Sequence, residues 1–445
     1  MVDIHNMYFI KKPKTINLKQ FRKNKSELDT FYGLPREVLF CKECCFSNQK
    51  PNSEQEYKHS ISTKKPTVNF DSKNICSACK TSRLKKNIDW KEREKMLIDL
   101  CNKYRRDDGR YDCIVPGSGG KDSFYASYML KYKYGMKPLT VTWAPMLYTE
   151  WGWKNFQAWI GAGFCNYSYT PNKVVQRYLT RLSLEKLFHP FQPFIMGQMY
   201  FPPKISYLMD IPLVFYGENP TEYGNNIKEN EIAQKEQNYF SKNNYDDLYV
   251  AGININELIE NYYLTKLDLD PYLPIDQNKI LEKKIDVQYL GFYLPWHPQE
   301  CYYTAVEKGG FQAAPERTLG TYSKYSSIDD KLDDFHYYTT YIKFGIGRAT
   351  YDASQEIRSG DIDRNEGLAL IKRFDGEYPD RFSKDIFEFL TINKNEGLNF
   401  YKVFENPEMN KDYFSNLTDN FRSPHLWKFK NDRWELRNTV FSNIP

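Results

Sequence analysis

The residues with the clearest chemical potential form one run, Ser118-Gly119-Gly120-Lys121-Asp122-Ser123. Its glycines leave backbone N–H groups free to turn toward an anion, and a helix that begins at Lys121 adds a favourable field. The Ser118 and Ser123 hydroxyls can donate hydrogen bonds, and Lys121 supplies a positive charge. Asp122 would repel a phosphate unless it holds a cation. The run therefore predicts a phosphate site with Mg²⁺.

The run does not follow the Walker pattern, because Asp122 comes directly after Lys121, where that pattern has Ser or Thr. An ordinary Gly-Ser turn between a strand and a helix is the alternative interpretation.

Two cysteine pairs precede this run, Cys41-x-x-Cys44 and Cys76-x-x-Cys79, with 31 residues between them. Each pair can present two thiolates from one tight turn, so together they predict a tetrahedral structural Zn²⁺ site. Cys45 could replace Cys44 as a ligand, and a redox pair or an iron–sulfur cluster is an alternative use of the cysteines. Three further cysteines are expected in the core: Cys101, Cys113 and Cys165.

A dense group of charged residues lies in the C-terminal half, among aromatic side chains. The acidic members are Asp329, Asp330, Asp333 and Asp334; the others are Lys324, His336, Lys343 and Arg348. Such a run is commonly a solvated helix face. The mixture of both signs also suits a site for phosphate and sugar hydroxyls. In that case Lys343 and Arg348 would bind an anionic part of the substrate, and His336 would be either a base or a packed core residue.

The elements that must position these residues alternate between strands and helices. Apolar runs predict strands over 111–115, 138–143, 167–170 and 212–216, and helical spacing predicts helices over 90–104, 121–134, 152–162, 173–188 and 196–208. Such alternation indicates a doubly wound parallel sheet, whose ligand lies at the carboxyl ends of the strands. Those ends carry Ser118, Trp143 and Glu218. Glu218 could orient a ribose or a metal ion, or cap the local backbone.

Four regions are expected along the 445 residues: a basic segment over 1–35, a cysteine module over 36–85, the ATP-binding domain over 86–220, and a mainly helical region over 221–445. The basic stretch 11–25 is expected to be a solvated, mobile terminus. Polar segments at 47–65 and 225–246 are interpreted as loops or insertions. The net charge of +5 is too small to indicate nucleic-acid binding. No signal peptide or membrane span is evident, so we expect a cytoplasmic protein.

The run from Ser118 to Ser123 resembles the PP-loop of the N-type ATP pyrophosphatases, which cleave ATP to AMP and pyrophosphate while they adenylate an oxygen. This resemblance implies an adenine nucleotide alpha-hydrolase-like domain behind a zinc-ribbon-like module.

Roughly residues 36–400 are similar to the N-acetyl sugar amidotransferase family of bacterial surface-polysaccharide, lipopolysaccharide and nonulosonic (pseudaminic or legionaminic) acid pathways, which include flagellin glycosylation. Besides the cysteines and the loop, the similar segments are 141–145, 194–198, 216–219, 222–224, 293–300, 320–330 and 343–350. The last two are the most specific.

This resemblance implies that ATP adenylates the acetamido oxygen of a sugar, that ammonia then attacks the activated carbon, and that AMP leaves to give an acetamidino group. It also implies a glutaminase partner and a cyclase-like partner of the imidazole glycerol phosphate synthase type. An ATP-dependent tRNA-modifying enzyme and a zinc-ribbon scaffold without activity are the alternatives.

The candidate residues follow from these motifs. ATP is expected at Ser118, Gly119, Gly120, Lys121, Asp122, Ser123, Trp143 and Glu218. The sugar is expected at Tyr322, Lys324, Asp329 and Asp330. Catalysis is expected from Lys121, Asp122, His336, Lys343 and Arg348, and structural zinc at Cys41, Cys44, Cys76 and Cys79.

Overall fold

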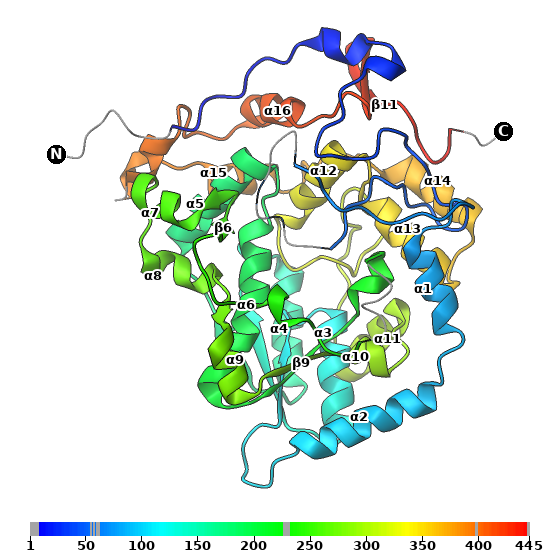
Figure 1. Cartoon of the computed structure of the whole chain (residues 1–445), viewed down its shortest axis with the longest axis vertical. Helices are drawn as coiled ribbons and strands as arrows, with labels where there is room; N and C mark the ends of the chain where they lie inside the picture. Colours follow the sequence, from blue (N-terminus) through cyan, green and yellow to red (C-terminus); the bar gives the residue numbers. More distant parts are fainter. Residues whose placement is uncertain are drawn as a thin grey trace.

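Figure 1 shows the computed structural model of the chain, which describes residues 9–53, 56, 58, 63–225, 232–396 and 399–442. Parts of the two predicted polar segments, at 54–55, 57, 59–62 and 226–231, lie outside the described residues. The parallel sheet and its covering helices occupy the lower half of the view, and helices from the C-terminal part of the chain lie above them.

The sheet has five parallel strands in the order β3-β2-β1-β4-β9. They are β1 (Cys113–Pro116), β2 (Pro138–Trp143), β3 (Asn166–Tyr169), β4 (Leu213–Tyr216) and β9 (Asp286–Tyr289). The predicted α/β class and parallel sheet are thereby confirmed. The sequence analysis missed β9, because its residues Asp-Val-Gln-Tyr form no apolar run and it lies at the edge of the sheet.

Alternate residues of the central strands face two different hydrophobic layers. Cys113 and Val115 pack with Leu97 of α2 (Trp90–Tyr104) and Ala126 of α3 (Lys121–Tyr128). Ile114 instead packs in the layer that contains α5 (Lys173–Leu187) and α6 (Gln192–Met209). This period of two is what a strand buried on both faces requires. The sheet is therefore covered on both sides, as the sequence predicted.

The strand order reverses beside β1, because β2 and β3 lie on one side of it and β4 and β9 on the other. In a doubly wound sheet this reversal opens a crevice at the carboxyl ends of the strands. The residues that leave β1 begin at Gly117, and those that leave β4 begin at Gly217. Both segments therefore emerge at the crevice.

The remaining elements form smaller helices and short strands around this sheet. The other helices are α1 (Ser77–Lys85), α4 (Glu150–Gly161), α7 (Ile255–Asn261), α8 (Lys266–Leu269), α9 (Gln277–Lys283), α10 (Leu290–Tyr293), α11 (Pro298–Gly309), α12 (Asp333–Phe344), α13 (Arg348–Ser359), α14 (Arg364–Phe374), α15 (Ser383–Leu390) and α16 (Lys411–Asn420). The short strands are β5 (Ser241–Lys242), β6 (Tyr249–Val250), β7 (Ile253–Asn254), β8 (Ile275–Asp276), β10 (Trp427–Lys430) and β11 (Arg433–Leu436). No helix in the described part of the chain is both long and apolar enough to cross a bilayer.

The beginning and the end of the described chain pack against each other, as the blue and red segments at the top of Figure 1 show. The Ile10 N–H donates to the carbonyl of Val403 at 2.6 Å, and the Tyr32 hydroxyl donates to the carbonyl of Phe421 at 2.6 Å. Phe21 is 1% exposed and meets the ring of Trp434. Phe21 therefore packs the basic stretch against the protein, while its described charged residues are exposed, as expected.

Candidate active site

The run after β1 has the backbone that an anion-binding turn requires. Gly119 has φ +89°, and a Cβ on it would lie 2.7 Å from the Cα of Phe156. A side chain at Gly117 would collide with Ser123. Helix α3 then begins at Lys121, so its unpaired N–H groups face the same space. A residue other than glycine at Gly119 would be both strained and sterically blocked.

The two opposite charges of this run contact each other. The Lys121 ammonium donates to both Asp122 carboxylate oxygens, at 2.7 and 2.8 Å. Burial is the largest single effect and lowers the pKa of Lys121, but Asp122, Cys301 and Glu218 together raise it above its usual value. Lys121 is therefore charged, as a phosphate-binding residue must be.

A cavity of 870 Å³ opens from this run and reaches the C-terminal helices. The predicted site residues that line it come from five separate places in the sequence: Ser118, Gly120, Lys121, Asp122, Glu218, Asp329, His336, Lys343 and Arg348. The structure thus brings the loop, the end of β4 and the C-terminal charged group to one cavity. Its size suits a nucleotide together with part of a second substrate.

Glu218 and Asp122 bring two carboxylates to the cavity. Burial and the nearby Asp122 charge raise the pKa of Glu218 to about 7. The Tyr223 hydroxyl donates to Glu218 at 2.8 Å and fixes its orientation. Two carboxylates that disfavour each other's charge would gain from a cation between them, so the donor set fits Mg²⁺.

Asp329 connects the C-terminal segment to the loop. Its side chain forms a hydrogen bond with Ser118, and burial raises its pKa. Helix α4 approaches so closely that a Cβ on Gly152 would lie 2.4 Å from the Asp329 Cα. The segment that precedes α12 therefore contacts the loop from Ser118 to Asp122.

Lys343 and Arg348 line the cavity but use their charges differently. The buried Lys343 ammonium contacts Glu56 at 3.0 Å and donates to the Leu187 carbonyl at 2.7 Å. The Arg348 guanidinium contacts Asp352 at 3.0 Å, donates to Ser327 Oγ at 3.1 Å, and stacks on the Tyr337 ring at 4.1 Å. Lys343 thus has protein partners on two sides.

Several predicted residues do not line the cavity. Gly119 shapes the loop from behind, and Ser123 Oγ donates to the Gly120 carbonyl at 3.0 Å. Asp330 accepts hydrogen bonds from the backbone N–H groups of Met146 and Leu332, at 2.5 and 2.9 Å. It therefore holds the segment before α12 in place.

Three further predicted residues also lie outside the cavity lining. Trp143 is 4% exposed and packs so tightly that a Cβ on Gly197 would meet its ring at 2.1 Å. The Tyr322 hydroxyl donates to Glu356 at 2.7 Å, and the Lys324 ammonium donates to the Pro315 carbonyl at 2.9 Å. Trp143 is a core residue in this structure, and the other two make contacts within the protein.

The four predicted cysteines meet in one buried cluster, with all sulfurs within 4.8 Å of one another. The Cys41–Cys79 and Cys44–Cys76 sulfur distances are 3.8 and 3.6 Å. Four thiolates around one tetrahedral Zn²⁺ at about 2.3 Å lie about 3.8 Å apart, so the cluster could bind zinc. Cys45 points elsewhere, into an apolar group with Ala349 and Ala353, and burial raises its pKa to about 12. Cys165 is exposed, so its expected place in the core was wrong.

The sequence analysis missed a second set of cavity residues. They are Lys50, Glu56, Lys65, His189 and Tyr337. The first three belong to the 47–65 segment, which we had interpreted as a loop or insertion. The ammonium of Lys50 lies over the rings of Phe46 and Tyr351, at 5.2 and 5.4 Å. No local motif marks these residues. For Lys50, Glu56 and Lys65, the one available signal is that they follow the cysteine pair Cys41 and Cys44, which is expected to belong to a folded module.

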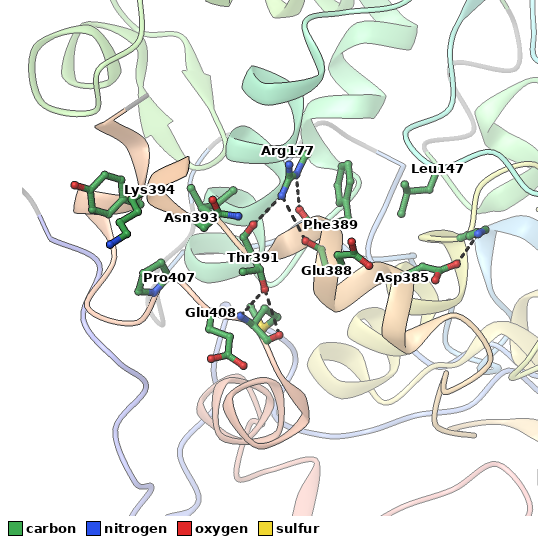
Figure 2. A pocket seen from close by; sticks show the side chains of 14 residues that line it. Leu147, Arg177, Asp385, Glu388, Phe389, Thr391, Asn393, Lys394, Pro407 and Glu408 are labelled. Atoms are coloured by element: carbon green, nitrogen blue, oxygen red, sulfur yellow. Dashed lines mark hydrogen bonds and ion pairs between the residues drawn. The ribbon is translucent and has the colours of Figure 1, made fainter. Parts of the chain in front are cut away.

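A second hollow of 1140 Å³ lies between α5 and α15 and is shown in Figure 2. Its Arg177 donates to the backbone carbonyls of Phe389 and Thr391, and its Lys331 ammonium pairs with Asp385. None of the residues predicted from the sequence lines it. The predicted site residues that line a cavity therefore all belong to the cavity beside the sheet.

Residues 319–440 match the family described as "LPS biosynthesis protein WbpG-like, C-terminal domain". The matched range begins just before the segment that carries Asp329 and includes α12 and α13. A stretch of 83 residues is 36% identical to an uncharacterized protein of Methanocaldococcus jannaschii, and it covers 19% of this chain and 29% of that relative. The domain match fits a role in polysaccharide biosynthesis and favours an enzyme; it does not favour tRNA modification.

Proposed function

We propose that this protein is an ATP-dependent amidotransferase of polysaccharide biosynthesis, which adenylates the acetamido oxygen of an N-acetyl sugar and replaces it with nitrogen. The products are an acetamidino sugar, AMP and pyrophosphate. One observation carries the proposal: the loop from Ser118 to Asp122 and the helices of the lipopolysaccharide-type domain line the same cavity.

The chemistry explains why ATP and an acetamido group would share a cavity. An amide carbon is a poor electrophile, and its oxygen is a poor leaving group. Adenylation corrects both defects, because AMP leaves with the oxygen. The loop offers backbone N–H groups and the Lys121 charge to the phosphates, as in the PP-loop that it resembles. The cavity beyond the loop then receives the sugar.

Two metal ions belong to this proposal. Asp122 and Glu218 would hold Mg²⁺, which neutralises phosphate charge when it is bound. Cys41, Cys44, Cys76 and Cys79 would hold a structural Zn²⁺, because four thiolates leave no open coordination position. None of these four cysteines is among the residues that line the cavity, and the cluster lies beside Lys50, which does line it.

Ammonia is the proposed nitrogen donor, supplied by a glutaminase subunit together with a cyclase-like subunit. Ammonia must reach the activated carbon unprotonated, which a transfer between subunits would ensure. The identity of these partners rests on the family resemblance. The reaction itself needs only free ammonia, so it is testable with the single chain.

The test incubates the protein with ATP, Mg²⁺, ammonium and a panel of free, UDP-linked and CMP-linked acetamido sugars. We expect pyrophosphate and AMP to form in a sugar-dependent way, and mass spectrometry to show exchange of one acetamido oxygen for NH. Lys121→Ala should slow both signals by about 10²- to 10³-fold, whereas Lys154→Ala on the exposed face of α4 should leave them unchanged. If tRNA stimulates pyrophosphate release and no acetamido sugar does, the proposal is wrong.

A further inference from the structure

Two histidine rings stack on one another in the wall of the cavity. His189 follows the end of α5, where Phe188 adopts the left-handed conformation with φ 49°. His336 lies on α12, and the two ring centroids are 4.9 Å apart at an interplanar angle of 21°. Phe191 packs on His336 at 5.2 Å. Two segments separated by almost 150 residues thus present a pair of imidazoles to one space.

Each ring has a buried nitrogen without a partner. The Nδ1 atoms of His189 and His336 are both shielded from solvent, and neither makes a hydrogen bond to any described residue. A buried polar atom without a partner is uncommon and calls for a ligand or a catalytic role. Because two different rings share this property at one cavity, chance packing is a poor account.

The surroundings keep both rings neutral. Burial is the main cause that lowers the pKa of His336, to about 4, with Arg348 and Lys343 contributing. Burial and the neighbouring His336 lower the pKa of His189, and Lys343 and Lys65 act in the same direction. Glu56 acts in the opposite direction on both. A neutral imidazole can accept a proton, and the nearby cations make it release that proton again.

We propose that His189 and His336 together form the proton relay for the nitrogen nucleophile, with His189 an additional catalytic residue. This inference rests on the proposed function. The pair and the loop from Ser118 to Asp122 line the same cavity, and contacts link them: Asp329 contacts Ser118 on the loop, and Ser327 contacts Arg348, whose guanidinium lies over the ring of Tyr337 next to His336. The activated carbon would lie between the loop and the pair.

The step balances as follows. The lone pair of ammonia forms a C–N bond to the imidate carbon, and the new ammonium loses one proton to a free imidazole nitrogen. The C–O bond to AMP breaks, and its electron pair leaves on the phosphate oxygen. The imidazolium passes its proton to the amidine, which is the stronger base, and returns to the neutral state.

Two half-reactions separate this role from a structural one. Acetamido-sugar-dependent pyrophosphate release without ammonium reports adenylation, and amidine formation with added ammonium reports nitrogen attack. For His189→Ala and His336→Ala we expect adenylation within about threefold of the wild type and amidine formation about 10²-fold slower. Added imidazole should restore part of the amidine rate in His189→Ala, which no structural role would produce.

Matched variants keep the result interpretable. His189→Phe retains a stacked ring without nitrogen and should show the same selective loss, even if the alanine variant folds poorly. His425→Ala removes another buried histidine, which contacts Ser423 and Gln49 and does not line the cavity, and it should leave the ratio of the two half-reactions unchanged.

Three outcomes would overturn the assignment. Equal loss of both half-reactions would make the pair structural, and full amidine formation in His189→Phe would exclude His189 from the relay. Absence of acetamido-dependent pyrophosphate release in the wild type would overturn the proposed function, and the relay with it.

Discussion

The two walls of the cavity hold their lysines in different ways. On the loop wall, Lys121 pairs with the adjacent Asp122 at 2.7 Å. On the opposite wall, Lys343 pairs at 3.0 Å with Glu56, which is 287 residues away in the sequence. An ion pair between adjacent residues can exchange partners when a phosphate binds, because the fold does not depend on that ion pair. A pair that joins distant segments is part of the fold, so we expect its loss to lower the stability of the protein.

The largest effect should come from the cysteine cluster. The segment that carries Lys50 and Glu56 follows Cys44 in the sequence, so the cluster holds the start of this segment. Cys76→Ser removes one ligand and should abolish stoichiometric zinc binding. Structural zinc contributes about 10–16 kcal/mol of apparent binding free energy in small modules, so the thermal midpoint should fall strongly. Metal analysis and thermal unfolding measure both.

Cys45→Ser is the matched control, because Cys45 is adjacent to a ligand but packs against α13 and α14. It should keep its zinc. Loss of zinc in Cys45→Ser, or its retention in Cys76→Ser, would contradict the assigned ligands.

On the loop wall, Lys121→Ala should slow sugar-dependent pyrophosphate release by about 10²- to 10³-fold, because it removes a charge aimed at the transferred phosphates. Its thermal midpoint should change little, since the Lys121–Asp122 pair is local. Initial rates and differential scanning calorimetry test the two halves of this prediction. A large loss of stability with little loss of rate would contradict the claim that Lys121 serves the reaction and not the fold.

On the opposite wall, Glu56→Gln should lower the free energy of unfolding by about 3 kcal/mol, because Lys343 and Lys65 then lose a buried partner. Urea denaturation measures this. Glu56→Gln combined with Lys343→Met should recover part of the loss, since the uncompensated charge is gone. Glu307→Gln, at an exposed pair with Lys308, serves as the control and should leave the urea midpoint unchanged.

The smallest effect is a pH dependence. Burial lowers the pKa of Lys343 to about 7, against 10.5 in the unfolded chain, so between these values the unfolded state binds more protons than the folded state. Stability therefore rises with pH in this window, by at most about 1.4 kcal/mol per pH unit from this group. Lys343→Met should flatten the rise between pH 7 and pH 9 in urea titrations. An unchanged slope would show that Lys343 does not lose its proton on folding.

The sheet and the loop were predictable because their signals are local. A strand such as β4, Leu-Val-Phe-Tyr, is an uninterrupted apolar run, and the loop from Ser118 to Asp122 is contiguous, so each carries its structure within a few residues. The cysteine pairs were predictable for the same reason, and they meet as expected.

The opposite wall was not predictable because distant contacts assemble it. Glu56 is an ordinary glutamate in a polar segment until Lys343 is brought beside it, and His189 gives no sign of its role until α12 supplies His336. Trp143 shows the converse: it stands at a strand end, where ligands bind, but α6 covers it.

The pairing of the two ends of the chain has a consequence for how the protein comes to be folded. Phe21 meets the ring of Trp434, and the Tyr32 hydroxyl donates to the carbonyl of Phe421, each some 400 residues later in the sequence. During synthesis these contacts form only after the segment near Phe421 and Trp434 has left the ribosome. Contacts so distant in sequence slow folding, because loop closure precedes any gain from them. A nascent chain arrested before residue 400 is therefore expected to be sensitive to proteases and to need chaperones.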